Sequence, residues 1–208
     1  VNILAIETSC DDTAAAVVQN KKVLSNIVSS QKIHELYGGV VPEVASREHD
    51  KLIVPVVSKA LTSSGLSLSQ IDAIAYTRGP GLMGSLLVGT SFAKSLSLSL
   101  NIPLLEINHM HAHILSIFID DGNDKPTFPF LALTVSGGHT QLVIVYSPND
   151  FNLVGTTLDD AAGEAFDKSG KLLGFEYPAG PKIDKKAKDG DPSKFKFTKP
   201  NVADLDFS

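Results

Sequence analysis

Short apolar stretches separated by polar turns open the chain. They span Asn2–Thr8, Ala14–Val18 and Lys22–Val28. Runs of this length that end in polar residues are typical of strands, so the pattern predicts two successive hairpins. The first hairpin turn, Ser9–Thr13, carries two carboxylates beside the single cysteine of the chain.

Strands and helices alternate through the rest of the first half. The pattern predicts, in order, a helical segment at 44–63, a strand at Ile71–Thr77, a glycine-rich turn at 78–84, a helix at Leu86–Leu100 and a strand at Leu104–Ile107. Pro55 lies inside the helical segment and predicts a kink or a division into two helices. The many small residues of the helix at Leu86–Leu100 suit close packing.

The pattern of strand, polar turn and strand then starts again after the polar segment 120–127. A shift of 127 residues places Leu131 on Leu4 and Thr140 on Thr13. Such self-similarity indicates an internal duplication. We therefore expect two lobes, 1–124 and 125–208.

The second copy differs from the first after its third strand. Helical patterns at Asp159–Leu173 and Gly180–Asp189 have no counterpart in the first copy, so a helical insertion is expected at 159–190. The elements that complete the first copy are missing from the second. We therefore expect the chain to be part of a longer protein.

The composition is that of an ordinary globular protein, with 208 residues, 43% of them hydrophobic and 20% charged. No apolar run approaches the length of a membrane span, and no secretion leader is evident. The single cysteine, Cys10, fits a reducing compartment, so we expect a cytoplasmic protein without a membrane contact. The net charge of −5 argues against nucleic-acid binding by the overall field. Only the lysine cluster at 182–199 suits an RNA backbone, and such clusters are usually solvated.

Three of the six histidines lie within the segment Asn108–His113. In a helix, His109 and His113 share a face and can meet one metal ion, while His111 points away. In an extended segment, all three would share one face. The alternative is a set of polar residues with satisfied hydrogen bonds at the end of a strand.

The two hairpin turns carry different chemistry. Ser136–Thr140 contains two glycines, which permit positive φ and close approach of a ligand, so its backbone N–H groups can form a nest for phosphate. The hydroxyls of Ser136 and Thr140 can add donors. The equivalent turn contains Asp11 and Asp12, which can position a cation or act as a general base. Either turn can also be an ordinary hairpin, because glycine and aspartate both favour turns.

These motifs together resemble the bacterial TsaD family, the tRNA N6-adenosine threonylcarbamoyltransferases, from one end of the chain to the other. The matching motifs are Ile6–Thr13, Tyr37–Glu43, Ala45–Arg47, Gly79–Leu82, the pair His109 and His113, Val135–Leu142, Asp159–Asp167 and Leu205–Ser208. The resemblance implies an α/β fold of the actin-like ATPase (ASKHA, ribonuclease H-like) type. It would have two duplicated lobes, the second of them incomplete and carrying the helical insertion.

The resemblance also implies an acyltransferase. The threonylcarbamoyl group would pass from threonylcarbamoyl-AMP to N6 of adenosine 37 in tRNAs that read codons beginning with A. The implied partners are tRNA, a paralogous scaffold subunit and an ATPase subunit, and the open second lobe leaves room for a homodimer. We expect the 208 residues alone to be inactive.

The resemblance assigns roles to individual residues. It implies one divalent ion, iron in preference to zinc, bound by His109, His113 and an aspartate beyond Ser208. It implicates Asp11 and Asp12 in catalysis. Many members have Glu in place of Asp12, so a role that depends on the reach of this side chain is weakened. The residues implied to bind threonylcarbamoyl-AMP or an adenine nucleotide are Thr134, Val135, Ser136, Gly137, Gly138, Asp167, Gly180 and Asp184.

Three other functions fit parts of the sequence. A small-molecule kinase can share the fold. A metalloendopeptidase is suggested by the spacing of His109 and His113, but Met110 follows the first histidine where a zincin carries its glutamate base. A scaffold protein without catalytic activity is the third.

Overall fold

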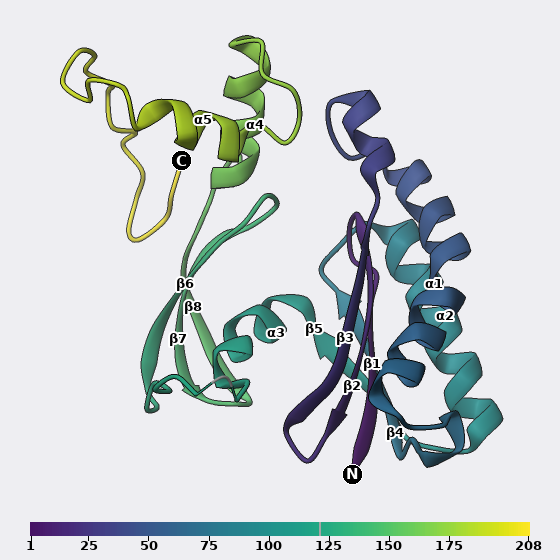
Figure 1. The fold of residues 1–208 in the computed structure, drawn as a ribbon. Coiled ribbons are helices and arrows are strands. Elements are labelled where there is room, and N and C mark those ends of the chain that lie inside the picture. The colour runs from purple at the N-terminus through teal and green to yellow at the C-terminus, as the bar shows by residue number, and fades with distance from the viewer. Residues whose placement is uncertain (121) are drawn as a thin grey trace. The chain divides into compact units, whose positions relative to one another are not determined.

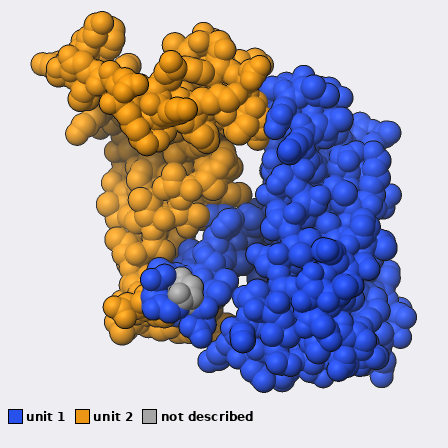
Figure 2. Space-filling view, viewed as in Figure 1, with its two compact units in different colours: residues 1–123 blue, residues 124–208 orange. Residues whose placement is uncertain are grey.

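The chain folds into two compact units, each with its own sheet. The structure is a computed structural model and describes residues 1–120 and 122–208. Residues 1–123 form unit 1 and residues 124–208 form unit 2 (Figure 2). The sequence analysis placed the boundary one residue later. Asp121, within the expected boundary segment, lies outside the described residues.

Unit 1 is built on a five-stranded sheet in the order β3-β2-β1-β4-β5. The strands are β1 (Asn2–Glu7), β2 (Asp12–Gln19), β3 (Lys22–Ser30), β4 (Ala73–Gly79) and β5 (Leu104–Asn108). The first three strands are antiparallel, which confirms the two predicted hairpins. β4 lies parallel to β1, and β5 lies parallel to β4. The carboxyl ends of β1, β4 and β5 therefore meet at one edge of the sheet.

Two long helices, α1 (Pro42–Ser64) and α2 (Met83–Leu100), lie side by side against one face of this sheet (Figure 1). The core between them and the sheet contains Leu4, Ile53 and Ile74. The shorter elements of unit 1 are η1 (Lys32–Tyr37), η2 (Leu68–Gln70), α3 (His109–Leu115) and η3 (Ser116–Phe118). None of the helices in the described ranges is long and apolar enough to cross a bilayer.

α1 is a single helix, not the two helices that Pro55 allowed. Pro55 lies on the exposed side of α1. A proline removes one backbone hydrogen bond, and the carbonyl left over on an exposed face can be hydrated. The apolar residues on the buried side of α1 pack against the sheet and keep the helix in place.

The small residues of α2 allow close packing, as the sequence predicted. A Cβ at Gly89 would lie 2.2 Å from Oγ1 of Thr8, and a Cβ at Gly84 would lie 2.2 Å from Oγ of Ser46. Both distances are far below van der Waals contact, so larger side chains would push α2 away from β1 and α1.

Unit 2 contains a three-stranded antiparallel sheet in the order β6-β7-β8, followed by two helices. The elements are β6 (Phe130–Val135), β7 (Thr140–Ser147), β8 (Asp150–Thr156), α4 (Ala162–Leu172) and α5 (Gly180–Ala187). Both helices lie within the range that the sequence analysis gave for an insertion.

The strand pairing of unit 2 repeats that of unit 1. Leu4 pairs with Val17 in unit 1, and adding 127 to both numbers gives the observed pair Leu131 and Ile144. The internal duplication inferred from the sequence is therefore present in the register of the first hairpin of each unit.

The two sheets differ in what covers them. Leu4 and Ile6 are 0% and 3% exposed beneath the helices of unit 1. Their equivalents Leu131 and Leu133 are 60% and 59% exposed. The same strand positions thus form a core in unit 1 and an uncovered apolar face in unit 2.

This difference predicts unequal costs for a matched pair of substitutions. Leu4→Ala should lower the free energy of unfolding of unit 1 by about 2–5 kcal/mol, because it leaves a cavity in a packed core. Leu131→Ala should change that of unit 2 by less than about 0.5 kcal/mol, because it removes exposed surface. Denaturant titration of residues 1–208, followed by the amide NMR signals of each unit, measures both. A similar loss at both positions would show that the face of β6 is covered in solution.

Candidate functional site

A carboxylate at the end of β1 accepts hydrogen bonds from three neighbours. Oε1 of Glu7 accepts from the backbone N–H of Ser9, and Oε2 accepts from Oγ1 of Thr77. Oε2 also lies 3.3 Å from Nδ1 of His109. Burial acts to raise the pKa of Glu7, but these hydrogen bonds outweigh it and lower the pKa to about 2. Glu7 is therefore ionised at neutral pH and can only accept hydrogen bonds.

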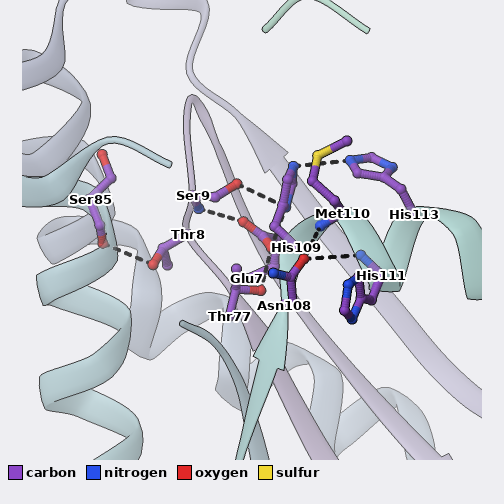
Figure 3. A network of polar contacts seen from close by, with 10 residues as sticks. All are labelled: Glu7, Thr8, Ser9, Thr77, Ser85, Asn108, His109, Met110, His111 and His113. Carbon is purple, nitrogen blue, oxygen red and sulfur yellow. Dashed lines mark hydrogen bonds and ion pairs between the residues drawn. The ribbon is translucent and has the colours of Figure 1, made fainter. Parts of the chain in front are cut away.

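The histidine cluster begins α3 at the end of β5. Oδ1 of Asn108 accepts from the backbone N–H groups of Met110 and His111, at 2.8 and 3.1 Å, and so caps the helix. The segment is helical, which selects the first of the two arrangements left open by the sequence. His109 and His113 then lie on one face, and His111 turns away from the pair (Figure 3).

The two imidazoles approach each other through Nε2, at a distance of 3.0 Å. Their ring planes are nearly perpendicular, at 88°. Two nitrogens bound to one ion at about 2.0–2.1 Å would lie roughly 3 Å apart. The observed separation fits two ligands of one ion, and without an ion it fits a hydrogen bond between the rings.

The surroundings of His113 favour its neutral form. Burial and the neighbouring His109 lower the pKa of His113. The neutral imidazole favoured by this shift is the form that binds metals. Within residues 1–120 and 122–208, no three His, Cys, Asp or Glu side chains come together as a metal site. The described chain thus supplies a pair of donors.

The acidic turn after β1 is fastened by a buried histidine of α1. Nε2 of His49 donates to the carbonyl of Cys10 at 2.9 Å, and Nδ1 accepts from Oγ1 of Thr13 at 2.7 Å. This assignment follows because a carbonyl can only accept. His49 therefore joins both ends of the turn that contains Asp11 and Asp12.

The glycine-rich turn before α2 holds the same segment from the other side. The backbone N–H of Leu82 donates to the carbonyl of Ser9 at 2.8 Å. A Cβ at Gly81 would lie 2.6 Å from that carbonyl oxygen, so a larger residue would displace the turn. Oγ1 of Thr8 donates to the carbonyl of Ser85 at 2.9 Å, which ties the turn to α2.

The side chains of the acidic turn differ in their surroundings. Asp12 is exposed and Asp11 is half-buried. Burial, together with these two carboxylates, raises the pKa of the Cys10 thiol to about 12. The thiol is therefore protonated at neutral pH and is a poor nucleophile. This leaves the two carboxylates as the candidate functional groups of the turn.

The equivalent turn of unit 2 is held by Ser136. Its backbone N–H and its Oγ bond the backbone of His139, at distances of 2.8 to 3.1 Å. In the described part of the chain, the N–H groups of Gly137 and Gly138 make no hydrogen bond, and a Cβ at either residue would meet nothing within 4 Å. The turn presents two N–H groups beside open space, which suits an oxyanion.

Two features of this turn add to what the sequence indicated. Gly137 and Gly138 do not have positive φ, so their value lies in the space that they leave open. The hydroxyl of Thr140 accepts from the backbone N–H of Ala162 at 2.9 Å and so holds the first turn of α4. The hydroxyl has this structural role because α4 begins next to the first residue of β7.

α4 packs on the backbone of the glycine turn. The N–H of Gly163 donates to the carbonyl of Ser136 at 3.0 Å. A Cβ at Gly163 would lie 2.8 Å from Cα of Gly137. Glycine at position 163 therefore lets the helix support the turn.

The other predicted residues of unit 2 lie on three elements. Thr134 and Val135 end β6. Oδ1 of Asp167, on α4, accepts from the backbone N–H of Ala179 at 2.7 Å and so binds the start of α5, where Gly180 lies. Asp184 is exposed on α5, 3.7 Å from Nζ of Lys188. The structure thus joins Asp167 to the start of α5 and leaves Asp184 at the surface.

The sequence analysis gave no role to Glu7 or His49. Glu7 lies inside the motif Ile6–Thr13, and His49 follows the motif Ala45–Arg47 by two residues. Their partners lie 102 and 36 residues away along the chain, and no local spacing reveals such pairs. A charged residue at the end of a buried strand was the one available signal for Glu7.

Solved structures define the class of fold. The ROK hexokinase from Thermus thermophilus matches 92% of this chain and 70% of its own, with a TM-score of 0.55 and 16% identity. YeaZ from Pseudomonas aeruginosa matches 74% of this chain and 66% of its own, with a TM-score of 0.50 and 18% identity. The chain has the actin-like ATPase (ASKHA) fold, as the sequence predicted.

The family follows from closer relatives. The family described as TsaD, tRNA N6-adenosine threonylcarbamoyltransferase, matches residues 22–208. Proteins of that name from Christiangramia forsetii and Porphyromonas gingivalis are 65% and 57% identical to this chain over 209 aligned residues each. These alignments cover 100% and 99% of this chain, but 62% and 61% of the relatives. The chain belongs to the TsaD family and spans about 60% of the length of these relatives.

The role of His49 can be tested by its effect on stability. His49→Leu leaves the hydroxyl of Thr13 and the carbonyl of Cys10 without this partner, so the free energy of unfolding should fall by about 1–3 kcal/mol or more. Asp50→Asn, at the next and exposed position of α1, should change it by less than about 0.5 kcal/mol. Denaturant titration measures both.

The same residue should contribute to acid sensitivity. Burial lowers the pKa of His49 in the folded state, so the unfolded state binds its proton first as the pH falls. The contribution is complete above the unfolded pKa of about 6.5 and is lost progressively below it. Titrations at several pH values should therefore show a shallower loss of stability below pH ~6.5 for His49→Leu than for the wild type.

Proposed function

We propose that the protein containing this chain transfers a threonylcarbamoyl group from threonylcarbamoyl-AMP to N6 of adenosine 37 in tRNAs that read codons beginning with A. The observation that carries the proposal is 65% identity, across the whole of this chain, to a relative named tRNA N6-adenosine threonylcarbamoyltransferase. The likeness to a hexokinase concerns the fold alone, at 16% identity.

The turn of unit 2 supports the binding of an acyl-adenylate. The N–H groups of Gly137 and Gly138 are available to the phosphate, and the open space beside them admits it. Asp167 uses Oδ1 to hold the start of α5, and Oδ2 can accept from a ribose hydroxyl. Thr134, Val135, Ser136, Gly180 and Asp184 complete the proposed binding set.

We assign one divalent ion, iron in preference to zinc, to His109 and His113. The convergence of their Nε2 atoms supports the assignment, and a further ligand must come from outside the described residues. A bound divalent ion supplies a Lewis acid for carbonyl or phosphate oxygens. Its donors in this chain are neutral imidazoles, which leaves most of its positive charge available.

The acidic turn supplies the proton chemistry. In the proposed reaction, N6 of adenosine forms a bond to the carbamoyl carbon, the bond from that carbon to the phosphate oxygen breaks, and AMP leaves. N6 loses one proton, and we propose Asp11 or Asp12 as the group that accepts it. The exposure of Asp12 leaves it free to meet a large substrate such as tRNA. We further propose a paralogous scaffold subunit and an ATPase subunit as partners, with a homodimer as an additional assembly.

The proposed reaction can be tested with the full-length protein. Incubation with threonylcarbamoyl-AMP, the partner subunits and a tRNA transcript should release AMP and add the threonylcarbamoyl group, detected by mass spectrometry of the digested nucleosides. A transcript with guanosine in place of adenosine 37 should remain unmodified, because it lacks the amine. ATP-dependent phosphorylation of a small metabolite without tRNA modification would favour a kinase instead.

The proposed metal ligands make a separate prediction. In the full-length protein, His113→Ala should abolish stoichiometric iron or zinc, measured by inductively coupled plasma mass spectrometry, because one of two converging donors is lost. His111→Ala should keep the metal, since this ring faces away from the pair. The polypeptide 1–208 should hold less than one ion per chain. One tightly held ion per chain in His113→Ala would contradict the assignment.

A further inference from the structure

Glu7 lies on the opposite side of the His109 ring from His113 (Figure 3). Its Oε2 approaches Nδ1, at 3.3 Å, whereas Nε2 of His113 approaches Nε2 of His109, at 3.0 Å. The two ring nitrogens of His109 therefore have different tasks. One meets a carboxylate, and the other faces the second histidine.

The other hydrogen bonds of Glu7 decide which nitrogen of His109 carries the proton. Both carboxylate oxygens already accept, one from the N–H of Ser9 and the other from Oγ1 of Thr77, so the contact with His109 requires a hydrogen on Nδ1. Neutral imidazole has one N–H, so the lone pair is then on Nε2. That lone pair faces Nε2 of His113. The proposed function assigns a divalent ion to these two nitrogens.

The carboxylate is held in position from two directions. Thr77 lies on β4, which runs parallel to β1 and pairs Tyr76 with Ile6, so the register of the sheet brings Thr77 beside Glu7. The N–H of Ser9 fixes the second oxygen. With both oxygens engaged and the side chain one-third exposed, Glu7 has little freedom to turn away from His109.

The hydroxyl of Ser9 is compatible with the same tautomer, because it can accept as well as donate. Oγ of Ser9 lies 3.3 Å from Nδ1 of His109. Oγ of Ser9 and Oε2 of Glu7 are thus the two oxygens within 3.3 Å of Nδ1 that are available to accept from it. Both residues come from the end of β1, so a shift of this strand end would move the ring.

We propose that Glu7 is the positioning residue of the histidine pair, fixing His109 as the Nδ1–H tautomer so that Nε2 can bind a divalent ion. The inference rests on the proposed metal site and adds a carboxylate that contacts the ligand without binding the ion. Carboxylates in this arrangement orient the imidazole and increase its basicity. Glu7 lies in unit 1 together with both histidines, so all three side chains belong to residues 1–123.

The first measurement needs no variant. In the metal-free full-length protein, ¹⁵N NMR of the histidine rings should show His109 with a proton on Nδ1 and a lone pair on Nε2. A proton on Nε2 of His109 would overturn the proposal.

The second measurement compares two matched variants. Glu7→Gln keeps the size of the side chain and removes its charge, and Zn²⁺ affinity, measured by competition with a chromophoric chelator, should fall by about 10–100-fold. Glu106→Gln is the control. Glu106 lies on β5 in the same sheet and bonds the hydroxyl of Tyr76 at 2.9 Å, so its loss should leave Zn²⁺ affinity unchanged. Circular dichroism confirms that both variants are folded.

The outcomes separate this inference from the proposed function. If the wild type binds Zn²⁺ and Glu7→Gln binds it equally well, the role of Glu7 is overturned and the metal site stands. If the wild type binds no divalent ion, the metal site is overturned, and the role of Glu7 toward the ion falls with it. If Glu7→Gln does not fold, the ¹⁵N NMR measurement of the His109 tautomer in the wild type tests the role of Glu7.

Discussion

The structure of unit 1 depends on the polar residues at the end of its central strand, β1. They lie at the packed edge of the sheet, and each needs a hydrogen-bond partner there. Glu7, Thr8 and Ser9 meet β4, α2 and α3 in turn. No buried side-chain nitrogen or oxygen in the described ranges lacks a hydrogen bond. Because an unpaired buried polar group is costly, satisfying these three residues fixes the turn, the neighbouring helix and the first histidine together.

The duplicated hairpin shows how one backbone arrangement supports two chemistries. The pairs Leu4–Val17 and Leu131–Ile144 have the same register. In unit 1 the turn that follows contains carboxylates and is tied down by His49. In unit 2 it contains Gly137 and Gly138, where a Cβ would meet nothing within 4 Å. The repeat supplies the position of each turn, and the side chains decide whether it attracts cations or anions.

Local patterns in the sequence predicted the elements and the histidine pair, because strand alternation and the spacing of His109 and His113 are local properties. They did not predict the link between Glu7 and His109, which depends on the order of parallel strands. The contact that engages Thr140 was not predicted for a similar reason. α4 packs against that turn and engages Thr140, and this contact between distant segments leaves no local signature.

Charge balance connects the carboxylate of Glu7 to the incomplete donor set. Two neutral imidazoles leave a divalent ion with its full charge, and one carboxylate behind His109 offsets only part of it. Binding an ion also requires the neutral form of His113, because a protonated imidazole has no lone pair to offer. Burial and the neighbouring His109 favour this form by lowering the pKa of His113. In the absence of an ion, the N–H at Nδ1 of His109 makes its Nε2 the acceptor and Nε2 of His113 the donor. To bind an ion through both Nε2 atoms, His113 must release that proton from Nε2 and take one up at Nδ1, so that its ring stays neutral.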